Sequence, residues 1–90
     1  MWENRFRKLG DQMNKNDENY VYYLVGQNLK RIRKEKKVTQ ERLSELSTYS
    51  LGFIMNIESN KYLQTFSLGT IWRFASVLKV DVREFFKPLD

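Results

Sequence analysis

The segment VTQERLSELSTYSLGFIMNIESN, residues 38–60, decides the fold of this chain. Thr39 suits the position just before a helix, because its hydroxyl oxygen can accept a hydrogen bond from a backbone amide that the first helical turn leaves free. Leu43 and Leu46 follow at the spacing of one helix face. The pattern predicts a short helix that begins after Thr39 and ends near Ser47.

A second short helix is predicted from Ser50 to about Glu58. Ser50 is another capping residue, and Ile54 and Ile57 supply one apolar face. Asn60 is a residue type that readily takes the left-handed conformation that ends helices. Because only a tight turn of about three or four residues separates the two predicted helices, they form a helix-turn-helix.

Further helices are predicted on both sides of this motif, each from apolar residues at helical spacing. The first runs from Tyr20 to Lys36 and carries Val21, Val25, Leu29 and Ile32. Another is capped by Ser67 and carries Leu68, Ile71, Phe74, Ala75 and Leu78. Asp81 and Glu84 have the spacing of a reciprocal cap for a last turn or two through Val82, Phe85 and Phe86, which Pro88 ends. We expect an all-α fold, a compact bundle of about five short helices, with one domain at residues 20–87 and a tail at 88–90.

Residues 1–19 are polar and rich in asparagine, which favours a mobile arm. Trp2, Phe6, Leu9 and Met13 nevertheless recur at the period of one helix face. A short docked helix is therefore the alternative.

The composition argues against catalysis. The chain of 90 residues, 41% of them hydrophobic, suffices for one modest core. It has no cysteine and no histidine, so it lacks common metal ligands, nucleophiles and proton-transfer groups. We therefore expect no enzyme, metal, cofactor or small-molecule substrate. No apolar run approaches the ~18 residues that span a bilayer and no secretory signal is apparent, so a cytoplasmic protein without a membrane partner is expected.

Excess positive charge is confined to residues 26–42. That stretch holds seven basic and two acidic residues, which accounts for the whole net charge of +5. A local cationic patch suits phosphate binding, because each neutralised phosphate releases condensed counterions. An ordinary solvated helix face is the alternative.

Three groups of residues in register resemble the phage repressor and Cro-type helix-turn-helix family, whose fold is lambda-repressor-like. They are Val25-Gly26-Gln27-Asn28-Leu29-Lys30-Arg31-Ile32-Arg33, Val38-Thr39-Gln40-Glu41-Arg42-Leu43 and Ile54-Met55-Asn56-Ile57-Glu58. The resemblance covers about residues 21–87. It implies a sequence-specific transcriptional regulator, a repressor, that binds double-stranded DNA.

The resemblance also implies residues that contact DNA. Base edges in the major groove would be met by Ser50, Leu51, Gly52 and Asn56, and phosphates by Lys36, Lys37, Thr39, Gln40, Phe53 and Lys61. Asn56 is the best base reader, because a carboxamide can donate and accept at once, as adenine requires. Gln40 lies in a first helical turn, where free amides favour a phosphate. For Ser50 and Asn56 a merely solvated surface position is the alternative.

Arg33 and Glu58 match a family pair that forms a partly buried ion pair. In the family this pair joins the helix predicted from Tyr20 to Lys36 to the end of the recognition helix, which is the one predicted from Ser50 to Glu58. We therefore expect a structural role for both. Arg33 then no longer counts among the phosphate-binding residues.

Five residues depart from the family pattern. Leu51 and Phe53 stand where the family more often has polar residues or tyrosine, so the recognition helix is unusually apolar, and Phe53 cannot donate a hydrogen bond to a phosphate. Ser44 stands where the family prefers alanine. Thr48 and Lys37 each replace a glycine. Lys37 is expected to adopt a positive φ at some energetic cost.

A homodimer on a palindromic operator is expected, because one helix-turn-helix contacts few base pairs. The interface is predicted at Trp72, Phe85, Phe86 and Leu89. Together these side chains have more apolar surface than a monomer of this size readily buries. Closure of the core by Phe85 is the alternative for that residue. The alternative function is a protein-interaction module, such as an antitoxin-like protein that binds a partner.

Overall fold

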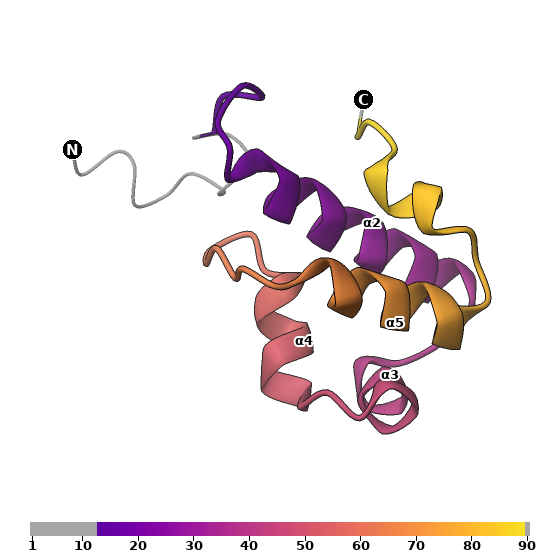
Figure 1. Ribbon diagram of the computed structural model, residues 1–90. Coiled ribbons are helices and arrows are strands. Elements are labelled where there is room, and N and C mark those ends of the chain that lie inside the picture. The colour runs from indigo at the N-terminus through magenta and orange to yellow at the C-terminus, as the bar shows by residue number, and fades with distance from the viewer. Residues whose placement is uncertain (1–12, 90) are drawn as a thin grey trace.

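A computed structural model describes residues 13–89 of the chain (Figure 1). These residues form, in order, α2 (Tyr20–Glu35), α3 (Gln40–Ser47), α4 (Leu51–Ile57), α5 (Leu68–Leu78) and the 3-10 helix η2 (Val82–Phe86). The all-α prediction is confirmed, since the described residues contain helices and turns but no strand. The prediction of an arm or docked helix falls largely on residues 1–12, which lie outside the described part.

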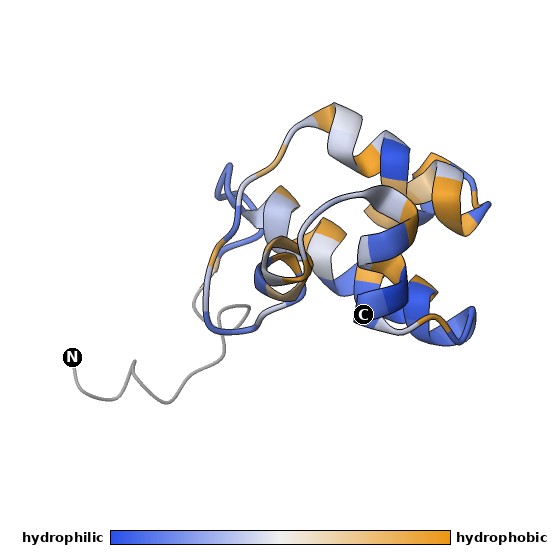
Figure 2. Cartoon of the chain, turned by 90° about the horizontal axis from the view of Figure 1, so that it is seen from below, coloured by the Kyte–Doolittle hydropathy of each residue, from blue (hydrophilic) through white to orange (hydrophobic). Residues whose placement is uncertain are grey.

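The helices pack as one bundle around α5. Figure 1 shows α5 beside α2, with α3 and α4 on one side of this pair and η2 on the other. Hydrophobic and hydrophilic residues alternate along the helices (Figure 2), as amphipathic helices around a shared core require. No helix in the described range has both the length and the apolar character needed to cross a membrane.

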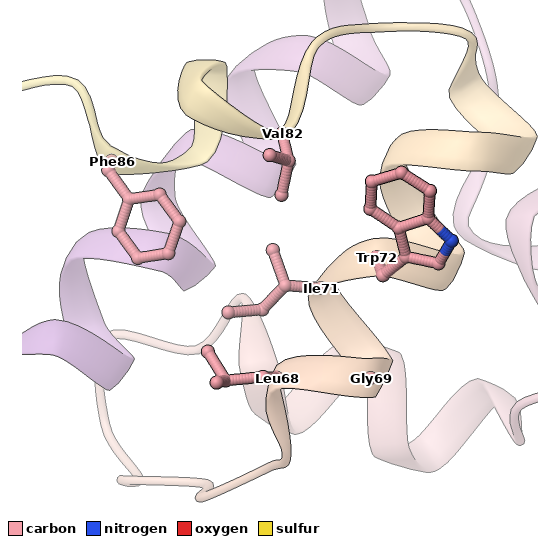
Figure 3. A pocket seen from close by; sticks show the side chains of 6 residues that line it. All are labelled: Leu68, Gly69, Ile71, Trp72, Val82 and Phe86. Atoms are coloured by element: carbon pink, nitrogen blue, oxygen red, sulfur yellow. The ribbon is translucent and has the colours of Figure 1, made fainter.

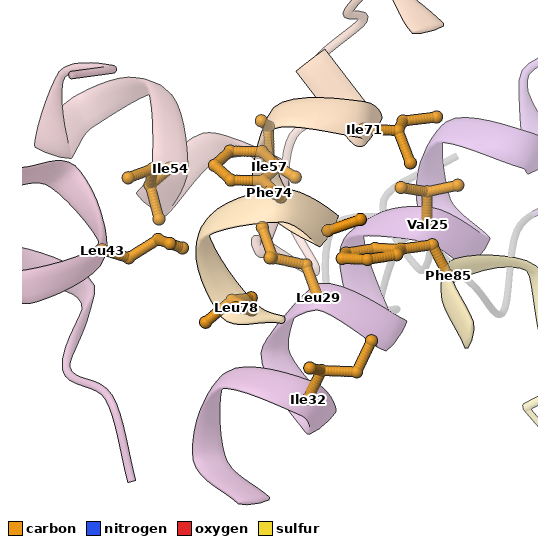
Figure 4. Close-up of a cluster of buried hydrophobic side chains, with 11 residues drawn as sticks. Val25, Leu29, Ile32, Leu43, Ile54, Ile57, Ile71, Phe74, Leu78 and Phe85 are labelled. Carbon is orange, nitrogen blue, oxygen red and sulfur yellow. The ribbon is translucent and has the colours of Figure 1, made fainter. Parts of the chain in front are cut away.

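Every described helix contributes to one apolar core (Figure 4). Its buried members are Val25, Leu29, Ile32, Leu43, Ile54, Ile57, Ile71, Phe74, Ala75, Leu78 and Phe85. Most of these are the apolar positions that the sequence pattern places on inner helix faces. Val21, Leu46 and Leu68 are exceptions, because they are 39%, 37% and 79% exposed. The prediction that these three residues belong to a core face is therefore wrong.

Three helices begin at their predicted caps. The hydroxyl oxygens of Thr39, Ser50 and Ser67 each accept a hydrogen bond from the amide three residues later, at 3.0, 3.1 and 3.2 Å. Each hydroxyl thereby satisfies an amide that has no partner within its own helix.

Asp81 caps the last helix, which begins at Val82, but without the reciprocal arrangement that the sequence predicts. The side chain of Arg83 donates to the Asp81 carboxylate at 2.9 Å, and together with the Arg83 amide it lowers the pKa of Asp81. The Glu84 carboxylate accepts from Lys87 at 3.1 Å. Glu84 also pairs with the guanidinium of Arg31 in α2 at 3.7 Å, and thus helps to hold the C-terminal segment against that helix.

Among residues 13–89, three residues other than glycine adopt a positive φ, namely Lys37 at 58°, Thr48 at 65° and Lys79 at 58°. The prediction for Lys37 is confirmed. Asn60 is not among them, and α4 ends instead at Ile57 with Glu58 in a right-handed helical conformation. The prediction of a left-handed Asn60 is therefore wrong.

A buried asparagine fastens the C-terminal segment to α2. Asn28 is 1% exposed, and its Nδ2 donates to the backbone oxygens of Phe85 and Lys87, both at 2.9 Å. Its Oδ1 accepts from the guanidinium of Arg31 at 3.2 Å. Because its donors and its acceptor are all engaged, this polar side chain can remain buried.

Phe85 is fully buried, and its ring closes the core beside α2. A side chain without exposed surface cannot contact a second molecule, so the prediction of Phe85 in a dimer interface is wrong. The other predicted interface residues, Trp72, Phe86 and Leu89, are exposed.

Candidate nucleic-acid interface

The turn between α3 and α4 is held by hydroxyl groups. The Ser44 hydroxyl donates to the backbone oxygen of Tyr49 at 2.6 Å, and the Tyr49 amide donates to the buried Ser47 hydroxyl at 3.3 Å. Ser44, one of the departures from the family pattern, thus bridges the turn. These bonds fix the two helices relative to each other even though Thr48 replaces the usual glycine.

Tyr49 joins this turn to α5. Its ring centroid lies 5.4 Å from that of Phe74, and its hydroxyl donates to Thr70 at 3.2 Å. The guanidinium of Arg73 lies over the ring, 5.7 Å from the centroid, and donates to the last backbone oxygen of α3 at 3.3 Å. Sequence reasoning assigned no role to Tyr49 or Arg73, because their contacts join distant parts of the chain.

The backbones of α2 and α4 meet at Gly26. A Cβ atom at this position would lie 2.1 Å from the carbonyl oxygen of Ile57, the last residue of α4. Beside this contact, Gln27 Nε2 donates to the backbone oxygen of Glu58 at 3.3 Å. Glycine is therefore required for α4 to sit as close to α2 as it does.

The ion pair that the sequence predicts between α2 and the end of α4 is present. Nε and Nη2 of Arg33 donate to the two carboxylate oxygens of Glu58, both at 2.8 Å. The two side chains are 10% and 2% exposed. Hydrogen bonds to the Glu58 carboxylate raise the pKa of Arg33. With its charge already paired, Arg33 is not available to a phosphate.

Gln40, the first residue of α3, belongs to the same network. Its Nε2 donates to Oε1 of Glu58 at 3.1 Å. The side chain thus links the N-terminus of α3 to the residue that ends α4. A phosphate contact by Gln40 stays a prediction.

One face of α4 is exposed and carries the predicted base readers. Gly52 and Asn56 are exposed on the side of the helix opposite Ile54 and Ile57, which are buried. Ser50 is exposed at the N-terminus of the same helix. The geometry therefore leaves these three positions open to a groove of DNA.

Leu51 and Phe53 of α4 are less accessible than Gly52 and Asn56. Leu51 is half-buried, and the half-buried ring of Phe53 packs against the core with its centroid 5.3 Å from that of Tyr49. The observed role of Phe53, which the sequence placed among the phosphate contacts, is packing.

The predicted phosphate-binding lysines lie at both ends of the motif. Lys36, Lys37 and Thr39 are exposed and lead directly into the first turn of α3. Lys61 is exposed in the loop after α4, where its amide donates to the Ser59 hydroxyl at 2.9 Å. The lysines thus precede and follow the two helices of the motif along the chain.

An apolar groove of about 470 Å³ lies between α5 and η2 (Figure 3). It is lined by Leu68, Gly69, Ile71, Trp72, Val82 and Phe86. Trp72, at one end of the groove, is 66% exposed. Leu89 and Phe86 line a neighbouring hollow beside Tyr20 and Leu24.

Two short helices joined by a tight turn, with one face of the second helix exposed, are typical of DNA-binding helix-turn-helix proteins. The helix-turn-helix family model matches residues 29–85. The chain therefore belongs to the helix-turn-helix family and is of the phage-repressor and Cro type.

Individual proteins agree with this assignment. The chain is 40% identical over 58 residues to the immunity repressor protein of Bacillus phage phi105, a match that covers 64% of the chain and 39% of the repressor. The crystal structure of the restriction-modification controller protein C.AhdI from Aeromonas hydrophila matches with a TM-score of 0.66 and 28% identity, over 74% of the chain and 98% of that protein. A hypothetical transcription factor from Neisseria, 19% identical, shares the fold with a TM-score of 0.68 over 86% of each chain.

Proposed function

We propose that the protein is a transcriptional repressor that binds a palindromic operator in double-stranded DNA as a homodimer. The observation that carries this proposal is the exposed face of α4, with Gly52 and Asn56 opposite the buried Ile54 and Ile57. A helix that is anchored on one side and exposed on the other, where Asn56 lies beside Gly52 and Met55, is suited to enter the major groove. The similarity to a phage immunity repressor and to a controller protein supports the regulatory role.

In this proposal Asn56 reads a base directly. Its carboxamide donates to N7 and accepts from N6 of adenine, which no other base pair offers in the same pattern. Leu51 contacts thymine methyl groups, Gly52 lets the backbone approach the groove, and Ser50 bonds a base edge or a phosphate.

The residues around the N-terminus of α3 bind phosphates. Lys36 and Lys37 provide charge, and Thr39 and Gln40 lie where the free amides of α3 begin. Lys61 provides a further contact beyond α4. Such contacts fix the position of the protein on the duplex but do not distinguish sequences.

The apolar groove between α5 and η2 is the proposed dimer interface. Trp72 and Phe86 are 66% and 40% exposed, which is unusual for large apolar side chains of a monomer. In the proposed dimer the two copies of α4 lie roughly 34 Å apart, because two-fold-related recognition helices meet half-sites that are one turn of DNA apart.

Selection of bound duplexes from a random library tests the proposal. We expect the wild-type protein to yield a palindromic consensus, and we expect Asn56→Ala to lose the base preference at one position in each half-site. Asn16→Ala, an exposed asparagine before α2, is the matched control and should leave the consensus unchanged.

A salt-dependent shift of the duplexes in a gel is expected at the same time. Failure to select any sequence, with no such shift, would contradict the proposal and favour the protein-interaction alternative.

A further inference from the structure

The loop between α4 and α5 is pinned at both ends. At its start the Ser59 hydroxyl accepts from the amides of Lys61 and Tyr62, at 2.9 and 3.2 Å. At its end the half-buried ring of Phe66 packs edge-on against Tyr22 of α2, with 5.2 Å between centroids. The residues between these anchors are therefore held beside the recognition helix.

Gln64 lies in this pinned loop and contacts Asn56. Its Nε2 donates to the backbone oxygen of Thr65 at 2.9 Å, which fixes the direction of its amide. Its Oε1 then accepts a hydrogen bond from Asn56 Nδ2 at 3.5 Å. Gln64 is half-buried, whereas Asn56 is exposed.

We propose that Gln64 is a positioning residue for base recognition, because it orients the carboxamide of Asn56. This inference rests on the proposed role of Asn56 as the base reader. An exposed asparagine amide can turn over and exchange its oxygen and nitrogen, and adenine is bound in only one of the two orientations.

The contact selects the orientation and still leaves Asn56 able to bind a base. One N–H of Nδ2 points to Gln64, while the second N–H and Oδ1 have no partner among residues 13–89. These are the donor and the acceptor that pairing with adenine requires. Gln64 therefore orients the carboxamide of Asn56 for base recognition before DNA binds.

The bond is long, so its loss should leave the stability of the fold unchanged. Its effect should appear in base discrimination instead. Removing a weak neutral hydrogen bond of this length corresponds to about a 2- to 3-fold fall in preference, the lower end of the range for hydrogen bonds.

The test uses the full chain and the duplex that the wild-type protein selects. Affinity is measured for this duplex and for three variants with other base pairs at the position that depends on Asn56. Gln64→Met keeps the length of the side chain but removes both hydrogen bonds. Thr65→Ala, which keeps the backbone oxygen that Gln64 contacts, is the control in the same loop.

We expect Gln64→Met to lower the preference at the Asn56-dependent position by about 2- to 3-fold. Preferences at other positions and the melting temperature should not change. In the Asn56→Ala background, Gln64→Met should have no further effect on discrimination, because no amide remains to be oriented.

Three results would overturn the inference. Unchanged discrimination by Gln64→Met, with discrimination lost in Asn56→Ala, rejects the positioning role and leaves the proposed function intact. A further loss in the Asn56→Ala background makes Gln64 a base reader in its own right. If Asn56→Ala itself leaves the selected consensus unchanged, both Asn56 as reader and Gln64 as its positioning residue are rejected.

Discussion

Gly26 of α2 and Ile57 of α4 touch backbone to backbone, since a Cβ atom at Gly26 would lie 2.1 Å from the Ile57 carbonyl oxygen. The contact lies at the last residue of the recognition helix. Any side chain at position 26 must therefore push α4 away from the bundle.

Gly26→Ala should lower the free energy of unfolding by about 1–3 kcal/mol, the usual cost of overpacking. Helix propensity alone would predict the opposite change in stability, because alanine is more favourable than glycine within a helix by ~1 kcal/mol. Gly69→Ala in α5 is the control, since its Cβ would meet only the Ser67 hydroxyl at an ordinary 3.5 Å. Urea unfolding of both variants measures the difference, and equal stability would mean that α2 and α4 can separate at no cost.

Glu58→Gln should lower the stability clearly, because it leaves the guanidinium of Arg33 without its countercharge in a nearly buried position. Breaking a fully buried pair costs roughly 3–5 kcal/mol, and less where water reaches the charge. Glu45→Gln is the control, because the pair of Glu45 with Arg42 is exposed on both sides and is worth at most about 1 kcal/mol.

Thermal unfolding compares the two variants, and the selected consensus of folded Glu58→Gln should match that of the wild type. A variant with unchanged melting temperature but an altered consensus would make Glu58 a base reader.

Lys36→Ala and Gln40→Ala should weaken binding to all duplexes alike, because phosphate contacts carry no sequence information. Lys36→Ala should also reduce the slope of log affinity against log salt concentration by about one. Titration of a selected and an unrelated duplex at several salt concentrations measures both effects. Weaker binding to the selected duplex alone would assign the residue to base recognition.

Phe86→Asp should give folded monomers, because a charge cannot be buried in an apolar interface without a partner. Its neighbour Phe85 is fully buried whereas Phe86 is 40% exposed, so Phe85→Asp should abolish folding instead. Analytical ultracentrifugation and circular dichroism separate the two outcomes. A Phe86→Asp protein that remains dimeric would place the interface on another surface.

Local signals in the sequence predicted much of the fold. Thr39, Ser50 and Ser67 cap the helices that they were expected to cap, because capping depends on residues only three positions apart. The Arg33–Glu58 pair joins distant residues, and the family resemblance was the signal that revealed it.

Contacts between distant side chains without such a signal could not be predicted. In the sequence, Asn28 and Arg73 resemble ordinary polar residues of a helix surface. Only the fold shows that the C-terminal backbone packs against Asn28 and that Arg73 lies over the ring of Tyr49. Leu68 has the spacing of a core residue, but it is the first residue of α5 and lies at the rim of the groove. The spacing of apolar residues does not show where the end of a helix extends beyond the helices that pack against it.

The hydrogen bonds of Asn28 have a consequence for operator architecture. They lock the segment around Phe86 onto the same rigid helix, α2, that meets α4 at Gly26. In the proposed dimer no hinge separates the surface that joins two copies from the surface that reads bases. The number of base pairs between half-sites is then set by the bundle itself, and an operator with one base pair inserted at its centre should not be accommodated by bending of the protein.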